Sequence, residues 1–255
     1  MQISSAFQLN NKVAIITGAS KGIGKAIAQA FGQQGAKVIV VSRKADAVKE
    51  TADEFRKEGI DATGIAAHMG DPVQIKNLVE QTIQTYGGID ILVNNAAINP
   101  VFGPILQTDN TVLDKIMDVN VKGPLEMCRL SHPYMKERGG GSIINISSIE
   151  GITPGLGLGL YSISKATLIA MTKVLAKEWG ADKIRANVIC PGLVQTKFSE
   201  ALTGNEKILK MVLAKQALPQ LATPEDIAGL ALFLAAEASS FCTGSIFTAD
   251  GGYTI

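Results

Sequence analysis

Tyr161 and Lys165 lie four residues apart, the spacing that brings two side chains onto the same face of a helix. An ammonium group beside a phenol favours the phenolate form, so the pair is suited to proton transfer. The alternation of glycine and leucine from 155 to 160 favours a loop directly before this helix. The spacing therefore indicates acid–base chemistry at the mouth of an apolar loop, with an ordinary surface Tyr–Lys pair as the alternative.

A glycine-rich turn, TGASKGIG at 17–24, follows a β-branched run and precedes a helical pattern. Gly18, Gly22 and Gly24 would permit a tight turn, close approach to a pyrophosphate and close packing of the helix. The N–H groups and the dipole at the start of that helix favour phosphate. The turn predicts dinucleotide binding, although turns also need glycine for backbone reasons alone. Its further candidate contacts are Ser20, Lys21 and Ile23.

The next strand ends in VVSRK, which bears on the choice of nucleotide. An acidic residue at this place would accept hydrogen bonds from the adenosine ribose of NAD and would repel a ribose phosphate. Here Ser42, Arg43 and Lys44 follow the strand instead, and Lys21 projects from the glycine turn. These donors favour the 2′-phosphate of NADP. A polar helix start with solvated charges is the alternative.

The composition is that of a globular protein, with 46% hydrophobic and 18% charged residues among 255. A net charge of +1 gives no field for nucleic acid or an anionic membrane. Cys128, Cys190 and Cys242 have no metal-ligand spacing, which favours reduced thiols and no metal site. Neither a secretory signal nor an apolar run of about 20 residues is present. We expect a cytoplasmic protein with no membrane partner.

Short β-branched runs alternate with helical patterns along the whole chain. This alternation predicts an α/β fold in which 1–255 form a single domain, a doubly wound parallel sheet with helices on both faces. Residues 193–222 carry no strand pattern and are predicted to form a helical lid over the substrate. Helices are expected to start after Asp71 and Thr223. The predicted strands are 12–17, 37–41, 61–68, 89–93, 142–147, 184–190 and 245–250.

These residues together resemble the classical short-chain dehydrogenase/reductase family from Lys12 to Gly252. The spacings between Ser148, Tyr161 and Lys165 agree with that family's pattern. The resemblance implies a Rossmann-like fold with a seven-stranded sheet and a dinucleotide cofactor, here NADP(H). Other matching positions are Asn94, Asn95, Ala96, Asn120, Pro191, Gly192 and Thr196.

The resemblance also implies the role of each catalytic residue. Tyr161 would be the acid and base, and Lys165 would lower the pKa of the phenol and hold the nicotinamide ribose. Ser148 would hydrogen-bond the substrate carbonyl oxygen, and Asn120 would anchor a water that relays protons to Lys165. Further implied cofactor contacts are His68, Met69, Asn95, Ala96, Pro191, Gly192, Val194 and Thr196.

More narrowly, VSRK, AINPVFG and PGLVQTKFS resemble the NADP-dependent carbonyl and retinal reductase branch. The chain departs from it at three places. It ends in Tyr253-Thr254-Ile255 instead of a peroxisomal tripeptide. His68 stands where most relatives have an aspartate that holds the adenine amino group, and Ala97 replaces the commoner glycine.

We therefore expect an oxidoreductase that reduces apolar ketones, aldehydes or diketones, and that assembles as a homotetramer or next a dimer. An alternative is a 3-oxoacyl carrier-protein reductase, for which Lys136, Arg138, Lys183 and Arg185 could form a docking surface. A non-catalytic dinucleotide sensor is a third possibility, which the intact set of four polar residues argues against. The apolar residues expected to line the substrate pocket are Ile98, Phe102, Ile152, Leu156, Leu158, Phe198, Leu202 and Met211.

Overall fold

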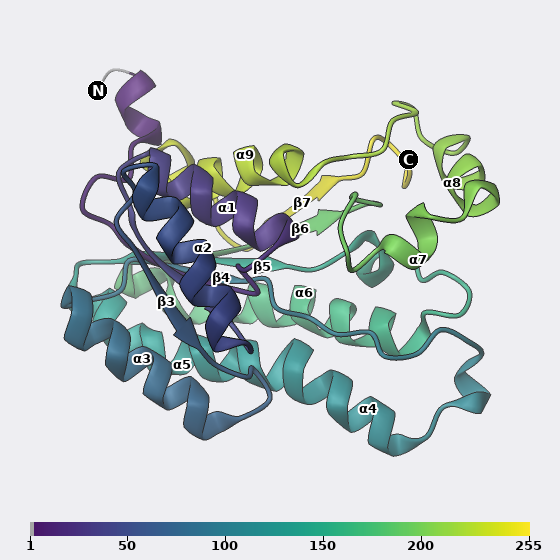
Figure 1. Cartoon of the computed structure of the whole chain (residues 1–255), viewed down its shortest axis with the longest axis horizontal. Coiled ribbons are helices and arrows are strands. Elements are labelled where there is room, and N and C mark those ends of the chain that lie inside the picture. Colours follow the sequence, from purple (N-terminus) through teal and green to yellow (C-terminus); the bar gives the residue numbers. More distant parts are fainter. Residues whose placement is uncertain (1–2) are drawn as a thin grey trace.

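The computed structural model describes residues 3–255 and is built around one parallel sheet (Figure 1). The strand order is β3-β2-β1-β4-β5-β6-β7, and every neighbouring pair runs parallel. Both the strand positions and the parallel order agree with the prediction. The strands are β1 (Val13–Thr17), β2 (Lys37–Ser42), β3 (Ala62–Ala66), β4 (Ile91–Asn94), β5 (Gly141–Ile146), β6 (Ile184–Pro191) and β7 (Ile246–Ala249).

The central strands are buried on both faces, which explains why their sequences are nearly all apolar instead of alternating. Every residue of β1 is buried, and so is every residue of β4. The edge strand β7 instead alternates between exposed and partly buried positions. The sheet therefore forms the middle layer of the molecule.

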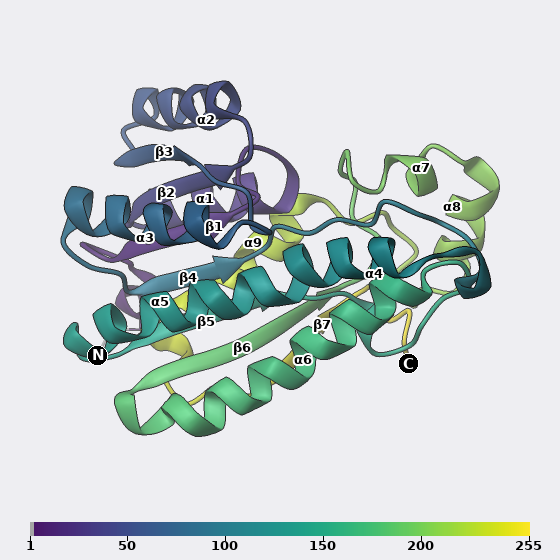
Figure 2. The same cartoon turned by 90° about the horizontal axis from the view of Figure 1, so that it is seen from below.

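Helices cover both faces of the sheet (Figure 2). On one face α1 (Gly22–Gln33), α2 (Ala45–Lys57) and α9 (Pro224–Ala235) pack through side chains such as Phe31 and Phe55. On the other face the helices pack through side chains such as Leu78 and Met127. This arrangement confirms the doubly wound architecture. The helices of the second face are α3 (Pro72–Tyr86), α5 (Gly123–Glu137) and α6 (Gly159–Trp179).

Two helix starts are capped as the sequence predicts. The Asp71 carboxylate accepts hydrogen bonds from the backbone N–H groups of Val73 and Gln74 at the start of α3. At the start of α9 the Asp226 carboxylate accepts from the N–H and the hydroxyl of Thr223. Each cap satisfies N–H groups or side chains that the helix itself leaves without a partner.

The carboxyl ends of the strands carry the connections that matter for function. The chain reverses its winding direction between β1 and β4, which creates the crevice where ligands bind in such sheets. The segment 193–222 forms two short helices beside it, α7 (Glu200–Thr203) and α8 (Glu206–Leu213), on the right of Figure 1. That this segment covers a bound substrate stays a prediction. Among residues 3–255, no helix has the length and apolar character needed to cross a membrane.

Candidate active site

Tyr161 and Lys165 both lie in the first turns of α6, directly after the glycine–leucine loop. The Lys165 side chain is 2% exposed, and its Nζ donates a hydrogen bond of 2.8 Å to the carbonyl oxygen of Ile146 at the end of β5. The same Nζ lies 5.5 Å from the centre of the Tyr161 ring. The helix therefore places the ammonium group beneath the phenol, as the four-residue spacing predicts.

The electrostatics of this pair differ from the expectation. Burial raises the pKa of the Tyr161 phenol, and a hydrogen bond with Ser148 opposes this only in part. Burial also lowers the pKa of Lys165 to about 8, which weakens the positive charge that should stabilise a phenolate. The direction of the phenol's shift is therefore opposite to the expected one, because desolvation of the phenolate is its largest cause. The expected lowering by Lys165 included the charge of a bound cofactor and stays a prediction.

Ser148 follows β5, and its hydroxyl lies close enough to the Tyr161 phenol to favour a lower pKa of that phenol. It is also the N-cap of a short 3-10 turn at Ile149–Gly151, where its hydroxyl oxygen accepts from the N–H of Glu150 at 3.1 Å. The strand end and the helix start thus bring a serine hydroxyl and a tyrosine hydroxyl together. Two such groups can donate to a single carbonyl oxygen.

Asn120 lies in a π-helical turn, Asp118–Lys122, that joins α4 (Asn110–Met117) to α5. Such turns are frequent at functional sites. The side chain is 1% exposed, and its amide exchanges hydrogen bonds of 2.9 and 3.0 Å with the backbone of Ile98. Its nitrogen also donates to the Ser164 hydroxyl at 3.1 Å. Asn120 therefore ties the loop after β4 to α6, next to Lys165.

Two serines that the sequence analysis did not select donate hydrogen bonds to the backbone of Tyr161 and Lys165. Ser147 donates to the carbonyl oxygen of Lys165 at 2.9 Å, and Ser164 donates to that of Tyr161 at 2.7 Å. Both are buried. Their polarity inside an otherwise apolar strand end and helix face is the signal that could have identified them.

The glycine turn after β1 packs tightly against the turn after β4. Gly18 has a φ of +67°, and a Cβ on Gly24 would lie 2.5 Å from the Asn95 amide nitrogen. That amide donates to the Thr17 carbonyl oxygen at 2.8 Å, while the Thr17 hydroxyl accepts from the N–H groups of Asn95 and Ala96, each at 3.0 Å. The two turns form a rigid cradle in which only glycine fits at positions 18 and 24.

The start of α1 faces this cradle with its N–H groups available. Lys21 precedes the helix and makes no side-chain cap, so the first-turn N–H groups keep their capacity to bind an anion. Ser20 and Ile23 are partly buried in the turn, and a Cβ on Gly22 would lie 3.3 Å from the Thr196 methyl group. The cradle and the open helix end fit the pyrophosphate of a dinucleotide.

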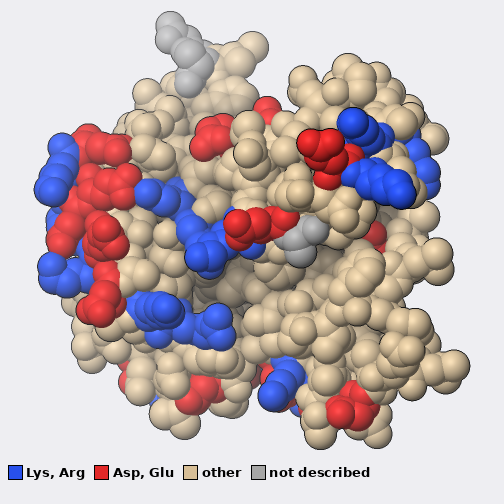
Figure 3. Space-filling view, turned by 45° about the vertical axis from the view of Figure 1, so that its right-hand side comes forward, with Lys and Arg blue, Asp and Glu red and all other residues tan. Residues whose placement is uncertain are grey.

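Cationic side chains flank the cradle where the sequence places them. Lys21, Arg43 and Lys44 are exposed, and Ser42 at the end of β2 is partly buried. Within residues 3–255, the cations that pair with acidic groups on α2 are others, such as Lys25 with Glu54. Figure 3 shows basic side chains beside a recess whose opposite side is largely uncharged. An anionic group and an apolar group could therefore bind at neighbouring places.

His68 lies after β3 and differs chemically from an aspartate at this place. Its Nδ1 accepts a hydrogen bond of 2.9 Å from the N–H of Gly70, so in the neutral ring the proton is on Nε2. The ring therefore offers a donor, whereas a carboxylate would offer an acceptor. Met69 beside it is 4% exposed and packs in the core under α3 and α5.

The segment after β6 lies across the glycine turn. Pro191 ends the strand, and the Gly192 N–H donates to the Ala249 carbonyl oxygen at 3.0 Å. Val194 is buried and pairs with Ala222 in a single parallel bridge, which closes the base of the 193–222 segment. Thr196 exchanges hydrogen bonds with Ser199 at the start of that segment.

Several of the predicted pocket residues form an exposed apolar rim around the tyrosine. The Phe198 ring is centred 6.1 Å from the Tyr161 ring, which brings the 193–222 segment to the site. Phe102 touches the loop before α6, because a Cβ on Gly157 would lie 3.0 Å from its ring. The rim residues with the most exposed side chains are Phe102, Ile152, Leu156, Phe198 and Met211. Ile98, Leu158 and Leu202 are partly buried.

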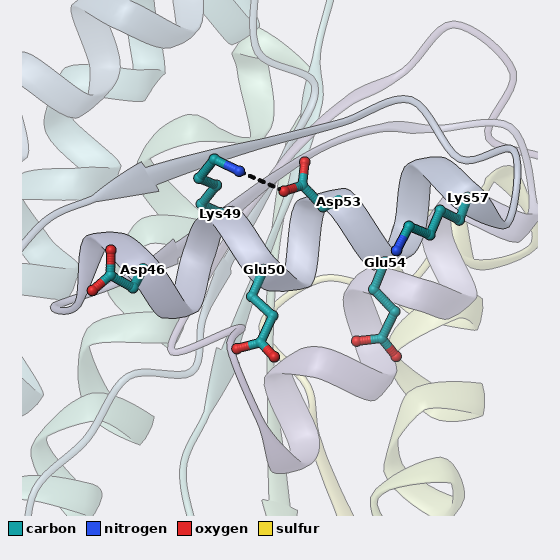
Figure 4. A pocket seen from close by; sticks show the side chains of 6 residues that line it. All are labelled: Asp46, Lys49, Glu50, Asp53, Glu54 and Lys57. Atoms are coloured by element: carbon teal, nitrogen blue, oxygen red, sulfur yellow. Dashed lines mark hydrogen bonds and ion pairs between the residues drawn. The ribbon is translucent and has the colours of Figure 1, made fainter.

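A shallow hollow of about 540 Å³ runs along the outer face of α2 (Figure 4). Its lining is entirely charged, and two of its four carboxylates are paired: Asp53 with Lys49 at 2.7 Å and Glu54 with Lys25 at 2.7 Å. Ion pairs of this kind on an exposed helix are solvated structural contacts. Its acidic and basic groups are nearly all exposed to solvent and lack the sheltered surroundings that adapt such groups to catalysis, so the hollow is not a candidate active site.

The cations considered for a carrier-protein surface lie at the amino ends of β5 and β6. Tyr161 lies at the opposite end of the sheet, beyond the carboxyl ends of these strands. Lys136 pairs with Asp182, and Arg138 pairs with the buried Asp90. Arg185 donates to carbonyl oxygens at the end of α9, including that of Leu234. Three of these four cations are therefore engaged in contacts within the fold, and a carrier-protein docking surface stays a prediction.

Known proteins share both the sequence and the fold. A family model described as "Enoyl-(Acyl carrier protein) reductase" matches residues 18–254. The "Dehydrogenase/reductase SDR family member 4" of Oryctolagus cuniculus is 41% identical over 244 residues, 96% of this chain and 94% of the relative.

Two solved structures that contain ligands are also similar. A 7α-hydroxysteroid dehydrogenase complexed with NADH and 7-oxo glycochenodeoxycholic acid has a TM-score of 0.95 and 32% identity, over 99% of this chain and 98% of the other. A gluconate 5-dehydrogenase of Burkholderia cenocepacia J2315 in complex with NADP and tartrate has a TM-score of 0.94 and 28% identity, over 98% of each chain.

Proposed function

Because the chain belongs to the short-chain dehydrogenase/reductase family, we propose that it is an NADP(H)-dependent oxidoreductase. It would reduce apolar ketones, aldehydes or diketones to alcohols, or catalyse the reverse oxidation. The observation that carries the proposal is the meeting of the Ser148 and Tyr161 hydroxyls above the buried Lys165, next to the glycine cradle.

Each step on the protein side follows from these positions. A carbonyl oxygen held by the Ser148 hydroxyl would lie within reach of the Tyr161 hydroxyl, which would donate its proton as negative charge develops on that oxygen. The raised pKa of Tyr161 suits this role, because the phenol stays protonated at neutral pH. Lys165 would stabilise the phenolate left after transfer. The bound NADPH supplies the hydride.

Asn120 has a less direct part in this scheme. Its side chain is occupied by Ile98 and Ser164, so it fixes the loop after β4 against α6. A water held at its backbone would extend the proton path from Lys165 to solvent. Its contribution would therefore be to position and to reload the acid.

The preference for NADP(H) over NAD(H) is supported by charge. Lys21, Arg43, Lys44 and the Ser42 hydroxyl surround the place of the adenosine ribose, and no acidic residue replaces them there. A 2′-phosphate, with a charge close to −2, would be attracted by these groups. Among the relatives, one solved structure contains NADP and another NADH, so the family alone does not decide the cofactor.

An apolar substrate is supported by the rim around Tyr161. Phe102 and Phe198 are more than half exposed, and the Phe198 ring lies beside that of Tyr161, so an apolar ligand would cover surface that otherwise contacts water. The solved relative with a 7-oxo steroid binds a ligand of this kind. The 193–222 segment would act as the lid over it. A cytoplasmic location is also part of this proposal.

A 3-oxoacyl carrier-protein reductase is the second candidate, because the matching family model is described as a carrier-protein reductase. Both functions would use the same four residues. They differ in whether the ketone is free or is attached to a protein.

A substrate panel separates the two candidates. NADPH oxidation, followed by its absorbance, would be measured with free aromatic and alicyclic ketones, with diketones and with a 3-oxoacyl thioester on a carrier protein. We expect kcat/KM to be highest for free apolar carbonyls. A carrier-bound substrate favoured by about tenfold or more would support the second candidate, and no oxidation with any carbonyl would contradict both.

A further inference from the structure

A carboxylate that neither the sequence analysis nor the proposed mechanism uses lies two residues after Ser148. Glu150 is partly buried, and its Oε2 accepts a hydrogen bond of 2.7 Å from the N–H of Gly155. The same oxygen accepts from the Ser162 hydroxyl at 3.0 Å. Ser162 is the neighbour of Tyr161 in α6. One side chain thus links the serine turn, the glycine–leucine loop and the helix that carries the acid.

The loop is held from its other side as well. The carbonyl oxygen of Gly157 accepts from the N–H of Gly103 at 2.9 Å, and Gly157 has a φ of +80°. The Phe102 ring packs against Gly157, where any Cβ would come within 3.0 Å of it. Glycine residues lose the most backbone entropy on ordering, so a loop of this composition needs such attachments to keep one conformation.

We propose that Glu150 is a positioning residue that fixes the segment 155–158 as one wall of the substrate pocket and thereby sets substrate affinity. This inference rests on the proposed function, since it assumes that the rim around Tyr161 receives the carbonyl substrate. A charged acceptor is the strongest partner available for the Gly155 N–H. A Cβ on Gly155 would lie 2.9 Å from the carboxylate, so the loop and the side chain are closely fitted.

The negative charge of Glu150 has a second effect, on the pKa of the Tyr161 phenol. The carboxylate contributes to the raised pKa of Tyr161, because it repels a phenolate. A glutamine would also accept from the Gly155 N–H, but more weakly, and without this repulsion. Substitution by glutamine can therefore separate the hydrogen bond to Gly155 from the effect of the carboxylate charge on the pKa of Tyr161.

The direct test measures the loop without measuring catalysis. Hydrogen exchange at the Gly155 amide is compared in the wild-type protein, Glu150→Ala, Glu150→Gln and Ser162→Ala. We expect exchange at Gly155 to be at least about 10-fold faster in Glu150→Ala, the factor for losing one hydrogen bond to a charged group. Ser162→Ala keeps the Gly155 contact and should change this exchange less. Equal exchange in Glu150→Ala and wild type would overturn the inference.

Steady-state kinetics then test the link to substrate. In Glu150→Ala we expect KM for an apolar ketone to rise about 10-fold, and Glu150→Gln should restore most of the affinity. In the reduction direction activity falls as Tyr161 loses its proton, so Glu150→Gln should shift that fall to lower pH, whereas Ser162→Ala should not move it. A purely structural role for Glu150 would leave the pH profile in place.

Together, the hydrogen-exchange and kinetic experiments distinguish failure of this inference from failure of the proposed function. Faster exchange at Gly155 with an unchanged KM in Glu150→Ala would overturn the inference, because the wall would then not bear on substrate. If the wild-type protein reduces no carbonyl, the proposed function fails, and the exchange arm still decides whether Glu150 fixes the segment. Should Glu150→Ala fail to fold, Glu150→Asp, which is one methylene shorter, replaces it with the same expected directions.

Discussion

Replacing Arg43 with alanine should remove much of the preference for NADPH over NADH. Arg43 is exposed after β2 and has no carboxylate partner within the described residues, so its guanidinium is available to a 2′-phosphate. NADH lacks this phosphate. The substitution should therefore raise KM for NADPH and leave the kinetics with NADH nearly unchanged.

The size of the effect follows from the exposure of the group. A hydrogen bond to a charged group contributes about 1.5–3 kcal/mol, which corresponds to roughly 10- to 150-fold. Solvent and salt screen exposed charges, so we expect the lower end, about 10-fold in KM for NADPH. Ser42→Asp should have a larger effect, because a carboxylate at the end of β2 would repel the phosphate and accept from the ribose of NADH.

The assay is kcat/KM for both cofactors at low and at moderate ionic strength. We expect the wild-type protein to favour NADPH by at least ~10²-fold, and salt should reduce this preference more in the wild type than in Arg43→Ala. Lys57→Ala is the matched control, since Lys57 is also an exposed cation but ends α2, about 20 Å along the helix from its start. Its kinetics should equal those of the wild type.

Two results would refute the reasoning. Equal efficiency of the wild type with NADPH and NADH would mean that the basic residues after β2 do not bind a phosphate. An equal loss with both cofactors in Arg43→Ala would mean that the side chain supports the fold or the general cofactor site instead.

Two further predictions concern stability and assembly. Lys165→Met should be more stable than the wild type at pH 7, by up to roughly 3 kcal/mol, because burial lowers the lysine pKa from 10.5 to about 8. From about pH 8 towards 10.5 the unfolded chain holds more of this proton than the folded one, so wild-type stability rises and the difference should shrink; urea unfolding at pH 7 and about pH 9.5 measures it. A difference that does not change with pH would contradict this account. Light scattering at micromolar concentration should show a homotetramer, or next a dimer, and a monomer would contradict that expectation.

Most of the fold could be predicted from local patterns. The β-branched runs that became β1, β2 and β4 are nearly all apolar because both faces of those strands are buried. The less apolar 61–68 run also contains a strand, since residues 62–66 pair with β2. The start of α3 followed from Asp71 and the proline after it.

The sequence predicts the parts of the site that depend on the spacing of residues along a helix. It does not predict properties that depend on burial or on contacts between distant residues. Four residues along a helix bring Lys165 under Tyr161, but the pKa of the phenol depends on how much water the fold excludes. The sequence gives no measure of that. Glu150 contacts Gly155 and Ser162 across a loop whose path no local pattern specifies. The pairing of Lys136 with Asp182 and of Arg138 with Asp90 was not predictable either, because each contact joins residues far apart in the chain.

The most direct test of the central claim is the turnover of Tyr161→Phe with NADPH and an apolar ketone. The phenylalanine keeps the ring next to Phe198 and removes only the hydroxyl that lies near Ser148. We predict that kcat falls by at least ~10²-fold, the contribution of general acid catalysis, while the Kd for NADPH measured by fluorescence stays nearly the same. A variant that keeps more than about a tenth of wild-type turnover would contradict the assignment of Tyr161 as the proton donor.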